Sequence, residues 1–397
     1  MGIRISYVFF AIGFVCICYS CREGSSKKER GGTQENVSLL QARFSKLLEY
    51  PLDANAIPRS FTKEIGKTRK VTSADWTSGF FPGNLWLLYR LTQDSAYLER
   101  AEKWTAFIQK EQFNDKTHDT GFMINCSFGN GLQFAEKKEY EAVVLQTAKT
   151  LSTRYRDRVG CIRSWDFNAD EWDFPVIIDN MMNLELLFKA TALSGDSTYY
   201  KIADTHARTT MANHFRADFS TYHVVDYDTI TGAVRKKQTH QGHDDGSSWA
   251  RGQSWAIYGY TMAYRFTQNK AYLERAKAAA DYFLTSGKLP ADGVPYWDFK
   301  DPKIPDAPRD VSAAAITASA LYDLHRYTDR DDYIDYADAV VTVLEEKYLL
   351  EEENNSPFLL DHSTGNKPKS DEIDEPIVYA DYYFLEALVK KRKLLVP

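Results

Sequence analysis

The segment Leu91-Thr-Gln-Asp-Ser-Ala-Tyr97 has three near-copies farther along the chain, and together they indicate the fold. The copies are Leu193-Ser-Gly-Asp-Ser-Thr-Tyr199, Phe266-Thr-Gln-Asn-Lys-Ala-Tyr272 and Tyr327-Thr-Asp-Arg-Asp-Asp-Tyr333. Each combines a turn that carries Asp or Asn at helix-cap spacing with a Tyr and, four residues later, an Ala. This pattern predicts a helix that begins just after the turn and buries one face.

Each of these turns lies between an apolar segment and a charged one. The apolar segments cover residues 83–90, 175–192, 249–265 and 311–326, and charged segments follow, for example at 98–110 and 273–284. A helix that is apolar on most sides is buried between other helices, whereas a helix with a charged face meets water. The alternation therefore predicts an inner and an outer layer of helices.

Two further pairs complete the pattern. One joins residues 121–134 to 140–155, and the other joins the C-terminal helix 380–390 to an early helix at 37–50. Six inner and six outer helices predict an all-α (α/α)6 toroid, with short β-hairpin insertions in its loops; an open α-solenoid is the alternative. In a toroid, the segments that lead into the inner helices converge at one end, which we call the mouth, and we expect the chemistry there.

The composition suits one closed domain over residues 37–397. The chain has 397 residues, of which 44% are hydrophobic and 26% charged, and its net charge is −6. The apolar fraction excludes a disordered chain, and the mild acidity argues against a nucleic-acid partner. The 8 Trp, 25 Tyr and 22 Phe residues are explained either by a large aromatic core or by platforms that stack on sugars.

The N-terminus resembles an export signal. Arg4 precedes an apolar run at residues 5–18, which is too short for an ordinary membrane span and predicts a signal peptide over 1–20. The next residue, Cys21, follows Ser20 as in a bacterial lipobox, and residues 21–36 resemble a flexible tether. We therefore expect lipidation of Cys21 and export to the periplasm or to a lipid-anchored position on a bacterial membrane.

The two cysteines of the folded part, Cys126 and Cys161, form no metal-binding pattern. Two buried free thiols are favoured over a disulfide between them.

Every segment that leads into an inner helix contains an aspartate. We interpret Asp75, Asp310 and Asp381 as capping or structural groups. Asp179 is different, because it follows Val176-Ile-Ile178 within an apolar run that predicts helix on both sides. A carboxylate there is buried, which is costly without a partner or a task. Asp179, and Asp119 in the segment 118–122, are therefore the candidate functional carboxylates.

Residues 240–255 bring together imidazole, amide, hydroxyl, indole and guanidinium groups. Trp faces stack on the apolar faces of sugars, and Arg can hold a carboxylate or sulfate through paired hydrogen bonds. The spacing of His240, His243, Asp244 and Asp245 matches no metal signature, so we predict no metal site. The chain also lacks the nucleotide-binding, zinc-protease and serine-nucleophile motifs.

Taken together, these segments resemble glycoside hydrolase family 88, the unsaturated glucuronyl hydrolases. The resemblance covers residues 36–392. It rests on Trp76-Thr-Ser-Gly-Phe-Phe-Pro-Gly-Asn-Leu-Trp86, His118-Asp-Thr-Gly-Phe122, Ile178-Asp-Asn-Met-Met-Asn183, Thr239-His-Gln-Gly242, Ser248-Trp-Ala-Arg-Gly-Gln-Ser-Trp255 and Asp310-Val-Ser-Ala-Ala-Ala315. The related unsaturated rhamnogalacturonyl hydrolases share the toroid and the paired aspartates, and the Trp-Ala-Arg-Gly-Gln run favours family 88.

The resemblance implies a substrate, a mechanism and a set of site residues. The substrate is a lyase-generated oligosaccharide, of the glycosaminoglycan type, whose non-reducing end is a 4,5-unsaturated uronic acid. The family hydrates the C4=C5 bond and needs no metal or organic cofactor. Asp179 matches its general acid/base and Asp119 its second essential aspartate. The matching substrate-binding residues are His118, His223, Gln241, Trp249, Arg251 and Trp255, with His223 in a predicted short strand at 221–226.

Two other functional classes remain open from the sequence. One is another glycosidase or a lyase on the same toroid, for which Tyr222 and His223 are candidate bases. The other is a non-catalytic, surface-tethered glycan-binding lipoprotein, whose membrane contact is only the lipid anchor. The basic run at residues 390–393 is interpreted as cations at a helix C-terminus rather than as a site for an anionic partner.

Overall fold

The computed structural model describes residues 39–286 and 289–395. The predicted signal peptide, Cys21 and the predicted tether lie outside the described residues. Of the early helix predicted at 37–50, residues 39–49 are helical. In the described part of the chain, no helix combines the length and apolar character needed to cross a membrane.

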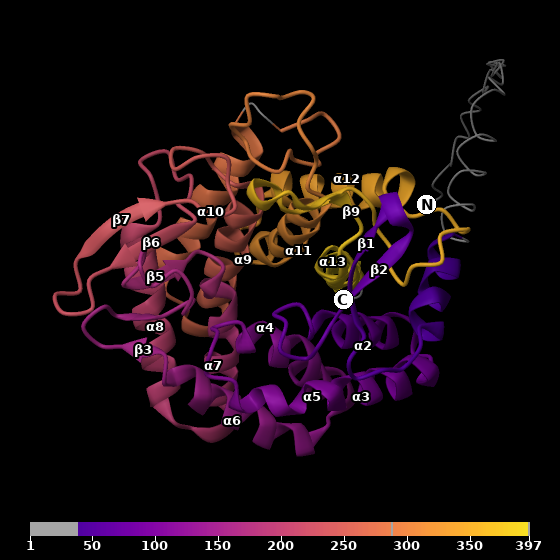
Figure 1. Cartoon of the computed structure of the whole chain (residues 1–397), viewed down its shortest axis with the longest axis horizontal. Helices are drawn as coiled ribbons and strands as arrows, with labels where there is room; N and C mark the ends of the chain where they lie inside the picture. Colours follow the sequence, from indigo (N-terminus) through magenta and orange to yellow (C-terminus); the bar gives the residue numbers. More distant parts are fainter. Residues whose placement is uncertain (1–38, 287–288, 396–397) are drawn as a thin grey trace, which may run out of the picture.

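Six helical segments form a closed inner ring, which Figure 1 shows as helices arranged around a common centre. They are α2 (Phe80–Thr92), α4 (Thr120–Ile124) with its continuation α5 (Asn130–Ala135), α7 (Asn180–Ser194), α9 (Ala250–Thr267), α11 (Val311–Thr328) and α13 (Val378–Leu395). A π-helical turn, η3 (Asn125–Gly129), joins α4 to α5. Sequential neighbours pack together and α13 packs against α2, so the ring is closed. The predicted (α/α)6 toroid is confirmed.

The outer layer consists of α3 (Ser95–Ile108), α6 (Glu141–Ser152), α8 (Ser197–Asn213), α10 (Lys270–Thr285) and α12 (Asp331–Lys347), together with the helix at 39–49. The short helices η1 (Lys63–Ile65), η2 (Gln109–Phe113), η4 (Lys138–Tyr140) and η5 (Lys367–Lys369) lie in the connections. In four pairs, α2 with α3, α7 with α8, α9 with α10 and α11 with α12, each outer helix packs on the inner helix before it. The predicted alternation of inner and outer helices is therefore observed.

The repeated turns form as predicted in three of the four copies. Asp94, Asp196 and Asn269 each accept a hydrogen bond from a backbone N–H in the first turn of the outer helix. The fourth copy differs, because Arg330 occupies the cap position of α12 and makes no side-chain cap. Its aspartate, Asp329, instead ends α11 in the left-handed region at φ 52°. The expectation of an Asp or Asn cap in every copy was therefore wrong for this one.

The Tyr and Ala positions of the repeat do pack inward. The four alanines, Ala101, Ala203, Ala276 and Ala337, are fully buried. Tyr272 on α10 donates a hydrogen bond to Asp204 Oδ1 on α8 at 2.6 Å, and Tyr333 on α12 donates one to Asp281 Oδ1 on α10 at 3.1 Å. Tyr272 and Tyr333 thus join neighbouring outer helices as well as filling space.

The third inner helix begins later than the sequence predicts. Residues 175–192 were expected to be helical, but Phe174–Ile177 form strand β5 and α7 begins only at Asn180. The run Val176-Ile-Ile178 is rich in β-branched residues, which favour a buried strand as much as an apolar helix. β5 pairs with β6 (Val224–Tyr227), which pairs with β7 (Val234–Gln238) in an antiparallel sheet. Asp179 therefore follows a strand and stands at the N-cap of α7.

Three smaller hairpins complete the loops. They pair β1 (Ile57–Thr62) with β2 (Lys67–Val71), β3 (Tyr155–Arg156) with β4 (Cys161–Ile162), and β8 (Ser363–Asn366) with β9 (Asp371–Glu375). The predicted hairpin insertions are therefore present, and the β8–β9 hairpin directly precedes the inner helix α13.

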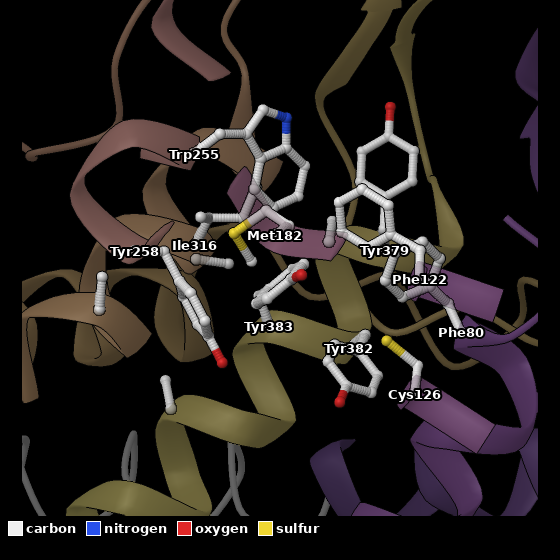
Figure 2. Packing of buried hydrophobic residues seen from close by; sticks show 14 of the residues in the cluster. Phe80, Phe122, Cys126, Met182, Trp255, Tyr258, Ile316, Tyr379, Tyr382 and Tyr383 are labelled. Atoms are coloured by element: carbon white, nitrogen blue, oxygen red, sulfur yellow. The ribbon is translucent and has the colours of Figure 1, made fainter. Parts of the chain in front are cut away.

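Aromatic side chains fill the centre of the ring. Figure 2 shows Phe122, Trp255, Tyr379 and Tyr383 gathered there, with ring centroids of Phe122 and Trp255 5.3 Å apart and of Trp255 and Tyr383 also 5.3 Å apart. These contacts fill the middle of the toroid with aromatic rings. Cys126 and Cys161 are buried free thiols, as predicted, and burial raises the pKa of both.

Candidate active site

A cavity of about 280 Å³ lies at the mouth, above the aromatic centre. Five inner helices contribute to it through the segments at their starts, and the β8–β9 hairpin forms another wall. Its lining residues are Arg59, Trp76, Asp119, Phe122, Trp165, Phe167, Ile177, Asp179, His240, Gln241, Trp249, Arg251, Gly365, Asn366, Lys369, Asp371, Glu372 and Tyr379. Both candidate carboxylates therefore open into one space.

Asp179 is held by the end of the three-stranded sheet. The N–H of Ile178 donates to the carbonyl of His223 at 3.0 Å, which extends the β5–β6 pairing up to Asp179. Although Asp179 occupies the N-cap of α7, its side chain accepts no cap hydrogen bond. Its side chain is only 13% exposed, and within the described chain Oδ2 has no hydrogen-bond partner.

These surroundings favour the protonated form of Asp179. Burial is the largest effect, and together with the nearby charge of Asp119 it raises the pKa of Asp179 to about 7, against the opposing effect of Arg251. The indole N–H of Trp255 also acts to lower this pKa, with a smaller effect. A carboxyl group with a pKa near neutrality can donate a proton and then accept one.

His223 lies beside Asp179 in one fixed tautomer. Its Nδ1 accepts hydrogen bonds from the backbone N–H groups of His240 and Gln241, both at 3.1 Å, so its proton is on Nε2. Nε2 lies 3.7 Å from Asp179 Oδ2. Burial holds the pKa of His223 well below its usual value, and the ring therefore stays neutral while its N–H faces the carboxyl group.

Asp119 stands at the N-cap position of α4. Its Oδ2 accepts a hydrogen bond from Thr117 Oγ1 at 2.9 Å, and its Oδ1 lies 3.3 Å from Nε2 of the fully buried His118. Burial lowers the pKa of His118. The side chain of Asp119 is 14% exposed, so its carboxylate reaches the cavity. The neutral imidazole of His118 contacts this carboxylate on the side away from the cavity.

Arg251 supplies a fixed positive charge. It is 1% exposed and its NH1 donates to Asp310 Oδ2 at 2.8 Å and to the carbonyl of Thr364 at 2.6 Å. The carbonyl of Gly365 accepts from its NH2. The guanidinium also lies over the ring of Trp249, 4.5 Å from its centroid. Protein acceptors thus hold both terminal nitrogens in place, and Arg251 brings a fixed charge to the wall of the cavity.

The eight site residues expected from the sequence form two layers. Asp119, Asp179, Gln241, Trp249 and Arg251 line the cavity. His118, His223 and Trp255 are not among the lining residues; the two imidazoles stand behind the carboxyl groups, and Trp255 is fully buried in the aromatic centre. The resemblance to family 88 assigned these residues to one site, but it did not distinguish the residues that line the cavity from those that stand behind them.

Several lining residues were not expected from the sequence. Arg59 on β1 is held by Glu372 through two contacts of 2.8 Å and by Asp75 at 2.8 Å. Trp165 and Phe167 stack with centroids 4.9 Å apart at the edge of the cavity. The Trp-x-Phe spacing was a signal for the stacked pair, whereas Arg59 and Glu372 are 313 residues apart and no local pattern joins them.

Tyr222, the other candidate base, does not line the cavity. It lies under the guanidinium of Arg216, whose central carbon is 3.9 Å from the ring centroid. Its neighbour His223 has Nδ1 engaged by two backbone donors. The Tyr222–His223 pair therefore does not form the exposed base that a lyase needs.

A second cavity, of about 420 Å³, lies at the opposite end of the ring and shares Phe122 with the first. Its acids are all paired: Glu185 contacts Arg265 at 2.7 Å, and Asp323 contacts Lys390 at 2.9 Å, as Glu386 does at 3.0 Å. Burial acts to raise the pKa of Glu185, but Lys189 and Arg265 outweigh it and lower that pKa to about 2. Lys390 and Arg265 likewise outweigh burial and lower the pKa of Asp323, so the mouth, which holds Asp179, is the better candidate for chemistry.

The chain resembles proteins of known family and structure. The family model described as Glycosyl Hydrolase Family 88 matches residues 54–284. An unsaturated glucuronyl hydrolase of Formosa agariphila is 54% identical over 397 residues, which is 99% of each chain. Another, from Bacillus sp. strain GL1, is 36% identical over 328 residues, or 80% of this chain and 86% of that one. A solved unsaturated glucuronyl hydrolase specific for heparin superposes with a TM-score of 0.88 at 40% identity, covering 92% and 98% of the two chains.

Proposed function

The chain belongs to glycosyl hydrolase family 88, and we propose that it removes a 4,5-unsaturated uronic acid from the non-reducing end of lyase-generated oligosaccharides. The observation that carries this proposal is the state of Asp179. Its carboxyl group is buried in the wall of the cavity, has a pKa of about 7 and lies beside a second carboxylate. A glycan-binding protein gains nothing from such a group, because a buried carboxyl costs stability.

The first chemical step is a proton transfer to carbon. The C4=C5 bond of the substrate is an enol ether through the ring oxygen, so its C4 accepts a proton from the Asp179 carboxyl group. Positive charge then develops on C5 and on the ring oxygen. The carboxylate of Asp119 opens into the same cavity and stabilises that charge. The Nε2–H of His223 faces Asp179 and stabilises the carboxylate that remains.

The second step is the addition of water. The Asp179 carboxylate takes a proton from a water molecule, whose oxygen bonds to C5, and the carboxyl group is restored. The product is a hemiketal at C5, which opens to a ketone and leaves a hemiacetal at the anomeric carbon. That hemiacetal then expels the remaining sugar. Because water never attacks the anomeric carbon, the carboxylate-separation rule for retaining and inverting glycosidases does not apply.

One absorbance assay separates this function from its rivals. The conjugated C4=C5 bond absorbs in the near ultraviolet, so the proposed enzyme lowers the absorbance of an unsaturated disaccharide. A lyase acting on the intact polysaccharide raises it, and a glycan-binding protein leaves it constant while binding is measured at equilibrium. Loss of absorbance with wild type but not with Asp179→Asn supports the proposal, and an absorbance rise or no change contradicts it.

A substrate panel defines the sugar class. One solved relative is described as specific for heparin, so unsaturated disaccharides from heparin form the first arm, in several sulfation states. Disaccharides from chondroitin and hyaluronan form the second arm, and an unsaturated rhamnogalacturonyl disaccharide forms the third. We expect turnover of glycosaminoglycan disaccharides, and preference for the rhamnogalacturonyl arm would overturn the assignment of substrate class.

For localisation, we propose export through residues 1–20 and lipidation of Cys21. The apolar run at 5–18 and the Ser20-Cys21 pair support this proposal. In a bacterial host, the mature protein should carry lipid on Cys21 by mass spectrometry and fractionate with membranes, whereas Cys21→Ser should not. Recovery of unprocessed wild-type chain that begins at Met1 would contradict the proposal.

A further inference from the structure

One asparagine joins the two segments that carry Asp179 and Asp119. Asn183 lies on α7, one helical turn after Asp179, and is fully buried. Its Oδ1 accepts a hydrogen bond from the backbone N–H of Phe122 at 2.8 Å, and its Nδ2 lies 3.2 Å from His118 Nδ1. Both partners belong to the segment that holds Asp119, so a single side chain fixes that segment against the start of α7.

The close approach of the two segments depends on Gly121. A Cβ added at Gly121 would lie 2.4 Å from Asn183 Oδ1 and 2.6 Å from Asn183 Cα. Real Cβ atoms do not come so near to another atom, so only glycine allows α4 to approach α7 at this depth. The carboxyl groups of Asp119 and Asp179 therefore stand at a separation that the Asn183 contacts and this glycine set together.

Asn183 also determines where His118 carries its proton. An amide Nδ2 only donates, so His118 Nδ1 must accept and the ring proton must be on Nε2. Nε2 lies 3.3 Å from Asp119 Oδ1. The charged or titratable groups that act on His118 are Asp119 on its own segment, Arg154 from the connection after α6, and His206 and His223. Of these, Asp119 is the carboxylate that lies beside Nε2, and a side-chain hydrogen bond with Asn180 also acts on the ring.

The geometry points to Asn183 as a positioning residue that ties the two carboxyl groups together and places the His118 proton on Nε2, beside Asp119. This inference rests on the proposed function for its catalytic meaning, but the tautomer of His118 is a property of the free protein. Asn183 acts through His118 and the backbone of Phe122, and it is not among the residues that line the cavity.

The test combines a spectroscopic and a kinetic measurement on Asn183→Ala. With ¹⁵N-labelled histidine, the wild-type spectrum should show His118 and His223 as neutral Nε2–H tautomers, each assigned by a His→Gln variant. In Asn183→Ala, His118 should lose its single tautomer while His223, held by backbone donors, keeps it. We expect kcat to fall about 10- to 100-fold with KM changed less than about threefold, because the carboxyl groups are displaced while the cavity remains.

The pH profile gives a readout that a loss of packing alone would not change. The groups that act on Asp179 are Arg251, Asp119 and Trp255, with His223 beside it. The charge of Asp119 raises the pKa of Asp179. Loss of the Asn183 hydrogen bonds should let Asp119 move away from Asp179, so the alkaline limb of kcat/KM should shift to lower pH. The matched control is Asn130→Ala, which removes a buried asparagine that bonds Cys126 O and Tyr382 Oη, away from the mouth cavity. Asn130→Ala should destabilise the protein, but the alkaline limb of its kcat/KM profile and the tautomers of His118 and His223 should match those of the wild type.

The possible results distinguish the positioning role of Asn183 from the proposed hydrolase function. An Nδ1–H tautomer of His118 in the wild type overturns the inference even if no variant folds. Wild-type kcat and an unmoved limb in Asn183→Ala overturn it as well. Absence of turnover in the wild type, with the Nε2–H tautomer present, contradicts the proposed function and leaves the hydrogen-bond assignment in place.

Discussion

Replacing Asp179 by Asn should stabilise the protein at neutral and alkaline pH while removing its activity. The folded protein holds the pKa of Asp179 at about 7, against 3.8 for an unperturbed carboxyl group. The folded state therefore binds the proton more tightly than the unfolded state does. Below about pH 4, Asp179 is protonated in both the folded and the unfolded state, so it does not change the free energy of unfolding. Between about pH 4 and pH 7, its contribution lowers the stability of the wild type as the pH rises.

The size of this cost follows from the two pKa values. Their difference corresponds to about 4 kcal/mol once the pH exceeds 7. For a chain of this length, about 4 kcal/mol shifts the melting temperature by about 5 °C. Asn has nearly the same shape as the protonated carboxyl group and never ionises. Asp179→Asn should therefore melt at the wild-type temperature at pH 4 and about 5 °C higher at pH 8.

Melting curves without substrate, recorded by tryptophan fluorescence between pH 4 and pH 8.5, test this expectation. Asp157→Asn serves as the matched control, because Asp157 is exposed and its replacement should leave the difference near zero at every pH. A variant that melts at or below the wild-type temperature at pH 8 would show that Asp179 is not held protonated, and the proposed acid would then lack its proton.

Three further results are expected. The kcat/KM of the wild type should fall as the pH rises through about 7, since only the protonated Asp179 starts the reaction; a rate that rises there refutes this role. Asp119→Asn should lower kcat and move that alkaline limb to lower pH, because the charge of Asp119 raises the pKa of Asp179, and an unmoved limb would contradict the coupling. Asp310→Ala should cost about 3–5 kcal/mol in urea unfolding, because it leaves the buried Arg251 without its carboxylate; an unchanged midpoint would show that the pair is not needed.

The ring could be predicted from the sequence because its signals are local. The caps at Asp94, Asp196 and Asn269 and the buried alanines repeat within short segments, and a closed ring is the arrangement that buries six apolar helices together. The prediction of a helix over 175–192 was wrong for its first residues, because a short β-branched run fits a buried strand equally well. Asp179 still lies at the mouth, because it falls between the end of the strand at Ile177 and the start of α7 at Asn180.

The candidate site was predictable only in part. Aspartates in the segments before inner helices indicated where the chemistry gathers, and Asp119 and Asp179 do open into one cavity. Arg251, which was predicted to bind the substrate, lines the cavity, and it also pairs with Asp310 and with carbonyl groups of the β8–β9 hairpin, which the sequence did not indicate. Such pairings join residues from distant segments, and only the folded chain shows which polar groups are already satisfied.

The most direct test of proton delivery to C4 uses an unsaturated disaccharide analogue whose glycosidic oxygen is replaced by carbon. This analogue cannot be cleaved at the anomeric carbon, but its C4=C5 bond can still take a proton and water. The wild type should abolish the near-ultraviolet absorbance of the analogue, and Asp179→Asn should leave it unchanged. If the wild type hydrolyses the ordinary disaccharide but leaves the absorbance of the analogue intact, the bond is broken at the anomeric carbon and Asp179 does not act on C4.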